Sequence, residues 1–216
     1  MSLEISDVSL RASKRLLIDK LSLSVAPGEI ASIMGPSGCG KSTLLAWLCG
    51  ALPEGITGSG TVMLAGERIS DRPMEQRGIG LLFQDDLLFP HMNVENNLAF
   101  GLPAGLSRSE RQHRIQNALR AAQLEGYDKH APSQLSGGQR ARISLMRTLL
   151  AEPKALLLDE PFSKLDAHLR GQVREFVFTT IQQRNIPALL VTHDRQDCPE
   201  RIITLETNDT VSVKND

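Results

Sequence analysis

A glycine-rich octapeptide, Gly35-Pro-Ser-Gly-Cys-Gly-Lys-Ser42, carries a specific chemical signal. Its glycines allow backbone N–H groups to close around phosphate oxygens, and the helix expected after it would present a positive N-terminus to the same anion. Lys41 would reach the β- and γ-phosphates of a nucleotide, and Ser42 would ligate Mg²⁺. A glycine-rich turn that binds nothing is the alternative. The candidate phosphate-binding residues are Gly35, Pro36, Ser37, Gly38, Cys39, Gly40, Lys41, Ser42 and Thr43, with Cys39 expected to be a packed residue.

An acidic pair, Asp159-Glu160, directly follows the apolar run Ala155–Leu158. A carboxylate at the end of a buried strand faces the crevice where open α/β sheets bind ligands. Asp159 would hold Mg²⁺, directly or through water, and Glu160 would act as general base on the attacking water. Taken alone, the pair fits two N-cap carboxylates about as well. In a chain that also carries a phosphate loop, the catalytic interpretation is favoured.

The pentapeptide Leu135-Ser-Gly-Gly-Gln139 is a second anion cradle, because a serine and two glycines precede an expected helix. The chain therefore has two phosphate cradles but one metal site. A capped helix with a flexible entry would explain the pentapeptide, but not the occurrence of two cradles in one chain.

The elements that must position these residues follow an α/β pattern. Alternating runs predict a half-exposed antiparallel layer near the N-terminus, with strands at Leu3–Val8, Leu21–Val25 and Gly60–Leu64. Nearly continuous apolar runs predict strands covered on both faces, the mark of a mostly parallel sheet. These runs are Ile30–Met34, Ile79–Phe83, Ala155–Leu158 and Ala188–Val191.

Residues from about 85 to 150 show no strand pattern and are interpreted as a helical subdomain inserted into the sheet core. Ser107 and Glu110 have capping-box spacing before one helix, and Gln139–Ala151 predicts another. A later amphipathic helix is expected around residues 169–181. Residues 201–213 are expected to form a terminal hairpin, with strands at Arg201–Leu205 and Thr210–Val213.

Composition excludes several classes of protein. Lys and Arg total 24 against 25 Asp and Glu, and this balance argues against a nucleic-acid partner. The first seven residues lack the basic and apolar regions of a signal peptide, and no apolar run approaches the ~18 residues that span a bilayer. If the protein works at a membrane, another chain must hold it there. Three cysteines at no metal-ligand spacing fit a reducing compartment.

Six motifs in a fixed order resemble the ATP-binding subunit of an ABC transporter. They are Gly35–Ser42, Gln84 after a strand, the signature Leu135–Gln139, Asp159-Glu160, Ser163-Lys-Leu-Asp166, and His193. The resemblance covers nearly the whole chain. It implies one ABC ATPase domain over residues 1–216, with a P-loop NTPase core, an N-terminal antiparallel β-subdomain and the inserted helical subdomain. ATP and Mg²⁺ are the implied ligands.

The resemblance also implies a head-to-tail dimer, either a homodimer or a pair with another ATPase subunit. The phosphate loop of one subunit and the signature of the other would sandwich each ATP. Ser136 and the backbone of Gly137 and Gly138 would then bind the γ-phosphate in trans. The candidate residues of this second cradle are Ser136, Gly137, Gly138 and Gln139.

Further roles are carried over by position. Gln84 would contact Mg²⁺ and the attacking water, Asp166 would link the two sites, and His193 would hold the γ-phosphate and orient Glu160. A lone histidine after a strand is more often packed or on the surface, but the other motifs favour the functional interpretation. The implied catalytic residues are Lys41, Gln84, Glu160 and His193, and the implied metal ligands are Ser42, Gln84 and Asp159.

The segment Leu88–Leu98 resembles importers of the thiamine, iron, sulfate and polyamine groups, in which it receives a short helix of the membrane subunit. Phe89, Met92 and Leu98 are candidate groove residues, with subdomain core as the alternative. The implied partners are transmembrane permease subunits and, indirectly, an extracytoplasmic solute-binding protein. The implied place is the cytoplasmic face of the inner membrane.

The sequence departs from the family at several positions. Ala12 stands where an aromatic residue commonly stacks on adenine, so Arg11 or Leu16 would have to cover the base, and weaker, less adenine-selective binding is expected. Lys164 stands where alanine is common. The segment after His193 is short and contains Pro199, so its helix is expected to be a turn. Because the sequence ends at Asp216, no C-terminal regulatory domain is expected.

Four other functions are weighed. An exporter ATPase shares the same motifs, so the prediction of import rather than export depends on the resemblance at Leu88–Leu98 alone. A soluble ABC-type switch in translation or DNA repair would usually carry tandem cassettes, long coiled coils or zinc hooks. A P-loop kinase has no use for the signature or His193. A degenerate scaffold would not need Lys41, Asp159, Glu160 and His193 intact.

Overall fold

The computed structural model describes residues 1–13, 15–199 and 201–205, which form two compact units. Unit 1 comprises Met1–Leu81, Lys154–Glu160 and the described residues from Thr180 onward. Unit 2 comprises Leu82–Pro153 and Pro161–Thr179. The predicted helical subdomain of residues 85–150 overlaps the first segment of unit 2, whereas the second segment was not foreseen. Within the described ranges, no helix is both long and apolar enough to cross a membrane.

An antiparallel sheet forms the first layer of unit 1, in the order β2-β1-β4-β5. Its strands are β1 (Leu3–Ala12), β2 (Arg15–Val25), β4 (Ile56–Leu64) and β5 (Glu67–Arg68). The predicted alternation is confirmed, but the strands are longer than expected. The register of β1 against β2 shifts between Ile5 and Val8, and Asp7 in between has φ +51°. Two further shifts, between Val8 and Leu10 and between Leu10 and Arg11, interrupt the two-residue period beyond Val8, where the predicted strand ends.

A second sheet has the order β6-β7-β8-β3-β9. Its strands are β3 (Ile30–Met34), β6 (Ile79–Leu82), β7 (Ala155–Asp159), β8 (Ala188–Thr192) and β9 (Ile202–Thr204). The pairs β7–β8, β8–β3 and β3–β9 are parallel, and β8 is buried along its whole length, as continuous apolar runs predict. The first strand of the expected hairpin is β9, paired in parallel with β3. The second lies outside the described residues.

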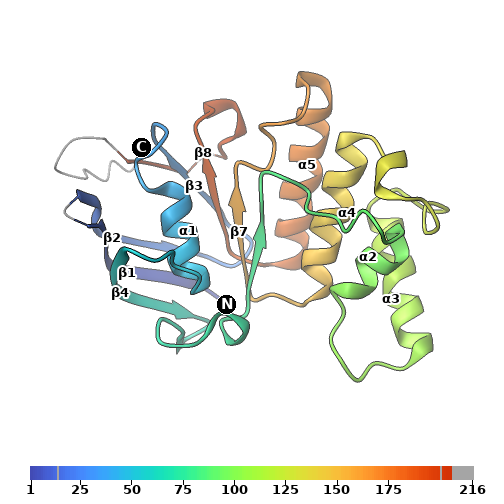
Figure 1. The fold of residues 1–216 in the computed structure, drawn as a ribbon, viewed down its shortest axis with the longest axis horizontal. Helices are drawn as coiled ribbons and strands as arrows, with labels where there is room; N and C mark the ends of the chain where they lie inside the picture. Colours follow the sequence, from blue (N-terminus) through green and yellow to red (C-terminus); the bar gives the residue numbers. More distant parts are fainter. Residues whose placement is uncertain (14, 200, 206–216) are drawn as a thin grey trace. The chain divides into compact units, whose positions relative to one another are not determined.

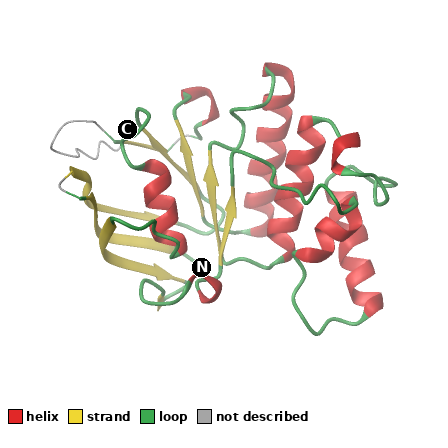
Figure 2. Cartoon of the chain, in the orientation of Figure 1, coloured by secondary structure: helices red, strands yellow, loops and turns green. Residues whose placement is uncertain are grey.

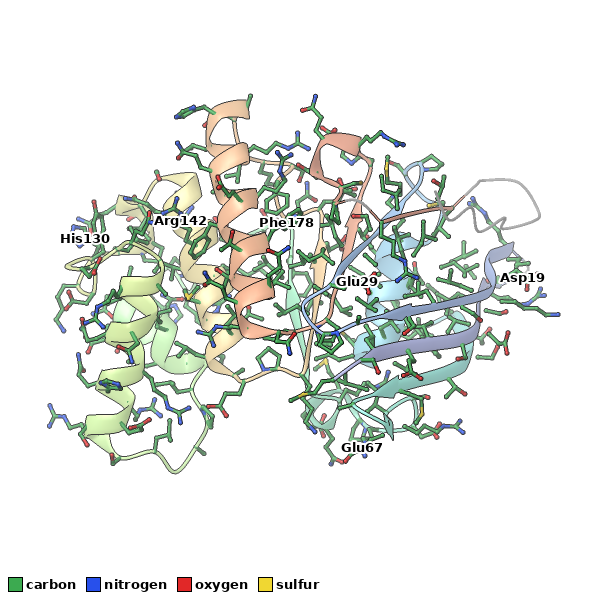
Figure 3. The ribbon with its side chains drawn as sticks, turned by 180° about the vertical axis from the view of Figure 1, so that it is seen from behind. Asp19, Glu29, Glu67, His130, Arg142 and Phe178 are labelled. Atoms are coloured by element: carbon green, nitrogen blue, oxygen red, sulfur yellow. The ribbon has the colours of Figure 1, made fainter. Side chains whose placement is uncertain are left out.

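Helix α1 (Lys41–Cys49) lies between the two sheets of unit 1 (Figure 1). Its apolar face is buried, and Leu44, Leu45 and Leu48 join one hydrophobic core with residues of both sheets. The turn before β3 is fixed as well. Glu29, labelled in Figure 3, accepts hydrogen bonds from the Ala26 N–H (2.6 Å) and from Arg201 (2.7 Å). These contacts hold the strand that leads into the glycine-rich loop.

Unit 2 is helical (Figure 2). It holds α2 (Val94–Phe100), α3 (Arg108–Ala121), α4 (Gly137–Leu150) and the first part of α5 (Ala167–Arg184). Ser107 caps α3 by accepting from the Glu110 N–H (3.2 Å), which is one half of the predicted capping box. The Glu110 carboxylate accepts from Arg114 (2.8 Å). Short 3₁₀ turns occur at Pro132–Gln134 in unit 2, and at Met74–Gln76 and Arg195–Asp197 in unit 1. The last of these is the turn expected after His193.

The C-terminus of α1 is closed by a buried side chain, Arg77. Its guanidinium donates to the carbonyls of Trp47 and Leu48, both at 2.8 Å, which are among the last in the helix. It also donates to the carbonyls of Ser70 (2.7 Å) and Arg72 (2.8 Å). One planar group with five N–H donors therefore binds four carbonyls, of which the Trp47 carbonyl also accepts from the Gly50 N–H (3.0 Å).

Replacing Arg77 by glutamine should lower the free energy of unfolding by about 2–3 kcal/mol, because buried carbonyls lose their donors. The midpoint of urea unfolding, followed by fluorescence of the sole tryptophan, Trp47, measures the change. Arg72→Gln is the matched control, since that side chain makes a surface ion pair with Glu67 and should cost under about 1 kcal/mol. Equal midpoints for the two variants would contradict the assigned role of Arg77.

Candidate functional site

The glycine-rich loop joins β3 to α1 within unit 1. Gly40 precedes the first helical residue with φ +100°, and a Cβ there would lie 3.1 Å from the Cβ of Leu17. A Cβ on Gly35 would lie 2.8 Å from both the Cys39 sulfur and the Leu205 carbonyl oxygen. The loop geometry therefore requires glycine at both positions. Glycine offers no side chain to cap α1, so the helix N-terminus is left to bind an anion.

Lys41 is the charged group at the centre of this loop and is only 6% exposed. Its Nζ donates to the carbonyl oxygens of Gly35 (2.7 Å) and Pro36 (2.9 Å). These acceptors are neutral, and a buried ammonium group is costly without an anionic partner. Phosphate oxygens would supply that charge, so the loop fits a nucleotide. Cys39 is buried 4.0 Å from the same nitrogen and is packed, as predicted.

Ser42 and Asp159 are brought together by α1 and β7, and the Ser42 hydroxyl donates to Asp159 Oδ1 at 3.1 Å. Mg²⁺ holds oxygens at about 2.0–2.1 Å in an octahedron, so neighbouring ligands lie about 2.9 Å apart. The observed spacing matches that edge. Among the described residues, no cluster of three or more His, Cys, Asp or Glu side chains is placed to hold a metal ion. Two protein oxygens completed by phosphate and water suit Mg²⁺.

The Asp159 carboxyl group is half-buried, and its ionisation reflects that position. Burial raises the pKa of Asp159, and the negative charge of Glu160 raises it further. The hydrogen bond from Ser42 and the charge of Lys41 act in the opposite direction without cancelling these effects. An ionised Asp159 is therefore costly until a cation arrives, which again fits a metal ligand.

Glu160 follows Asp159 in an unusual conformation, with φ +45°. A non-glycine residue in the left-handed region stores strain, which often marks a functional position. Its N–H donates to the Val191 carbonyl (2.9 Å), and its Oε1 lies 3.0 Å from Nδ1 of His193. Thus the ends of β7 and β8 place Glu160 and His193, two of the four predicted catalytic residues, side by side. The carboxylate is largely covered and the imidazole is more than half exposed.

The signature residues lie in unit 2, at the start of α4. Ser136 caps this helix reciprocally: its Oγ accepts from the Gln139 N–H (3.2 Å), and Gln139 Oε1 accepts from the Ser136 N–H (2.8 Å). The first helical turn contains Gly137 and Gly138, and a Cβ on Gly138 would approach Val173 to 3.3 Å. This reciprocal cap fixes the N-terminus of α4. Because the Ser136 hydroxyl acts only as an acceptor in the cap, its own O–H group can donate a hydrogen bond to a ligand.

Gln84 and Asp166 also belong to unit 2. Gln84 is exposed just after β6. Asp166 caps α5, because its Oδ1 accepts from the N–H groups of His168 (3.2 Å) and Leu169 (3.0 Å). The structure thus brings together Lys41, Ser42, Asp159, Glu160 and His193 in unit 1, and places Gln84, Ser136 to Gln139 and Asp166 in unit 2.

The candidate groove residues divide between core and surface. Leu98 is fully buried, so of its two predicted roles the structure supports core of unit 2 rather than a groove residue. Phe89 and Met92 are half-buried. The most exposed apolar side chains here are Leu87 (52%) and Phe100 (65%), and the Phe100 ring meets Phe89 edge-on at 4.7 Å.

The expected adenine position carries no aromatic ring. Ala12 and Arg15 pair at the end of the β1–β2 hairpin, and Arg11 pairs with Leu16. Arg11 is exposed and Leu16 is half-buried, so these two side chains are the available cover for a base.

Sequence reasoning missed a charged cluster around Asp85 and Asp86. Arg140 Nε lies 3.0 Å from Asp86 Oδ2, and Lys164 pairs with Asp85. Arg140, Ser144 and Arg147 recur at helical spacing, and this polar stripe was the available signal.

The family described as "ABC transporter" matches residues 18–163, more than half of the chain. The chain belongs to the ABC transporter family. It is 48% identical over 195 residues to the uncharacterized ABC transporter ATP-binding protein YnjD of Escherichia coli (strain K12), covering 90% of each protein. The fold and motifs identify an ABC ATPase domain.

Two further relatives of this ABC ATPase carry transport names. The Fe(3+) ions import ATP-binding protein FbpC of Escherichia coli O157:H7 is 38% identical over 213 residues, which cover 98% of this chain and 59% of FbpC. The sulfate/thiosulfate import ATP-binding protein CysA of Gloeobacter violaceus is 38% identical over 217 residues, covering 100% of this chain and 60% of CysA. The chain therefore spans about three fifths of the length of these two import proteins.

Proposed function

We propose that this ABC ATPase is a Mg²⁺-dependent, ATP-hydrolysing subunit that powers a membrane importer of a small solute. The observation that carries the proposal is the set of groups in unit 1: a buried ammonium in a glycine loop, a hydroxyl–carboxylate pair at metal-ligand spacing, and a carboxylate beside an imidazole. These are the parts that phosphoryl transfer to water requires.

Each residue then has a defined task. The glycine-loop N–H groups and Lys41 bind the β- and γ-phosphates, and Ser42 and Asp159 hold Mg²⁺. The bound ion would neutralise developing charge on the phosphate oxygens. Glu160 Oε accepts a proton from the attacking water as its oxygen bonds to the γ-phosphorus and the bond to ADP breaks. His193 Nδ1 lies 3.0 Å from Glu160 Oε1 and would orient that carboxylate. The same ring would hold the γ-phosphate.

Unit 2 supplies the second cradle. The capped N-terminus of α4 supports binding of a γ-phosphate by Ser136, Gly137 and Gly138 of the opposite subunit in a head-to-tail dimer. The dimer partner is a second copy or another ATPase subunit. Gln84 would contact Mg²⁺ and the attacking water, and Asp166 would link the two sites. Closure on ATP and reopening after hydrolysis would then drive the transporter.

Import is supported by the names of FbpC and CysA and by the segment Leu88–Leu98. The exposed Phe100 ring contacts the half-buried Phe89 in unit 2, and Leu87, two residues before Phe89, is also exposed. Exposed apolar side chains of this kind suit a permease helix. The subunit would work at the cytoplasmic face of the membrane, held by permease subunits that receive solute from an extracytoplasmic binding protein.

The variant Glu160→Gln should bind ATP and stay dimeric but lose at least about 100-fold in kcat, because glutamine cannot accept the proton. Phosphate release measures turnover, and sedimentation with ATP measures the dimer. Glu54→Gln is the control, since Glu54 is exposed in unit 1. Normal turnover in the Glu160 variant would remove Glu160 as the base.

The absence of an aromatic ring at Ala12 predicts weak discrimination between ATP and GTP. Base stacking contributes ~1–3 kcal/mol in nucleic-acid complexes, so affinity should be lower by about one or two decades than with a stacking ring. Titration of both nucleotides gives the ratio of dissociation constants, with Lys41→Ala as the non-binding reference. The variant Ala12→Tyr should tighten ATP binding and favour adenine. A wild-type site that is already tight and adenine-selective would refute this.

A mild-detergent pull-down of the tagged protein from its native cells, with mass spectrometry, tests the transport role. Polytopic membrane subunits should co-purify in a defined ratio. Recovery of ribosomal or DNA-repair proteins alone would overturn the importer function and favour a soluble switch.

A further inference from the structure

The charged cluster of unit 2 connects three segments to which the proposed function assigns different tasks. Arg140 donates from Nε to Asp86 Oδ2 (3.0 Å) and from one terminal nitrogen to the Leu135 carbonyl (2.8 Å). Leu135 immediately precedes the signature serine, and Asp86 lies two residues after Gln84. A single guanidinium therefore bridges the signature and the Gln84 segment. Lys164, which precedes Asp166, pairs with Asp85.

Asp86 is held to α4 by its backbone as well. Its carbonyl oxygen accepts from Ser144 Oγ (2.8 Å) and from Arg147 (3.3 Å), and Arg147 also donates to the Leu87 carbonyl (2.8 Å). Residues 140, 144 and 147 lie on one face of the helix. The backbone after Gln84 is therefore locked to the helix that begins with the signature.

A cavity of about 330 Å³ lies within unit 2 and is lined by all three segments, with Gln84, Gly137 and Leu165 among its walls. Its lining also includes the four charged residues of the cluster, Asp85, Asp86, Arg140 and Lys164. Burial raises the pKa of Asp86, and the hydrogen bond and charge of Arg140 oppose that rise. Without Arg140, the half-buried carboxylate would lose its hydrogen-bonded cationic partner, with the charges of Lys164 and Arg147 still nearby.

We propose that Arg140 is a positioning residue that couples the two ATP sites of the dimer through Asp86. The inference rests on the proposed function, in which Gln84 serves its own subunit's ATP and the signature serves the partner's. Binding of ATP at either site then biases the geometry of the residues that serve the other. This is a coupling free energy between sites, and it is reciprocal.

The test is the dependence of steady-state ATP hydrolysis on ATP concentration in the full-length protein. The wild type should show a Hill coefficient above 1, with two sites setting a ceiling of about 2. Arg140→Gln should lower the coefficient toward 1, with a several-fold loss of kcat. Asp86→Asn should do the same, and the double variant should be no worse than either single variant. Arg140→Lys should give an intermediate Hill coefficient. Lysine keeps the charge, but its single ammonium group does not reproduce the planar guanidinium that binds Asp86 and the Leu135 carbonyl through separate nitrogens.

Arg142→Gln is the matched control on the same helix. Arg142, labelled in Figure 3, lies over the Phe176 ring and donates to Gln123 and the Ala122 carbonyl, so its loss should leave the Hill coefficient unchanged. Thermal unfolding of every variant separates coupling from stability, and the isosteric Asp86→Asn carries the test if Arg140→Gln does not fold. A non-cooperative wild type, or an unchanged coefficient in the variants, overturns the proposal. A wild type without ATP hydrolysis instead overturns the proposed function.

Discussion

The parallel pairing of β3, β8 and β7 is the constraint on which the chemistry of unit 1 depends. In the register of the sheet, Met34 lies beside Thr192, and Asp159 lies beside Val191. Because all three strands run in the same direction, their carboxyl ends reach one edge together. The glycine loop follows β3 and His193 follows β8, whereas Asp159 is the last residue of β7 and Glu160 comes next. A shift by one residue in any pairing would separate groups that must act within hydrogen-bond distance.

The charged groups at this edge lie in surroundings that favour binding of ions of opposite sign. The Lys41 ammonium is buried against neutral carbonyls, and Asp159 is half-buried beside a second carboxylate. Each charge is costly in such surroundings, and each cost falls when an ion of opposite sign is bound. The backbone of Glu160 is also strained. The sheet and core around it hold a left-handed conformation that an isolated chain would avoid.

Features set by short stretches of sequence were predictable, and features set by distant partners were not. The glycine loop, the buried strands and the cap at Ser107 each follow from a few adjacent residues, and all three are present in the structure. The bulge at Asp7 depends on how β1 meets its neighbours. Leu98 is apolar in a groove or in a core, so its type alone does not decide between them. Arg77 binds the distant carbonyls of Trp47 and Leu48, and Arg140 binds the distant Asp86 carboxylate. The helical spacing of Arg140, Ser144 and Arg147 indicates a polar stripe but does not identify these partners.

The segment from Asp86 to Asn93 shows why side chains are used where regular structure is absent. Its backbone groups cannot be satisfied by a ladder of their own, so they require other donors and acceptors. Asn97 accepts from the Phe89 N–H (2.8 Å) and donates to the carbonyls of Phe89, Met92 and Asn93. Ser144 and Arg147 bind the carbonyls at the other end of the segment. Hydrogen bonds of this kind are directional, so they fix the position of a loop more narrowly than apolar contact does. Such a network ties an irregular segment to a helix, and connected hydrogen bonds of this kind can carry energetic coupling between two sites.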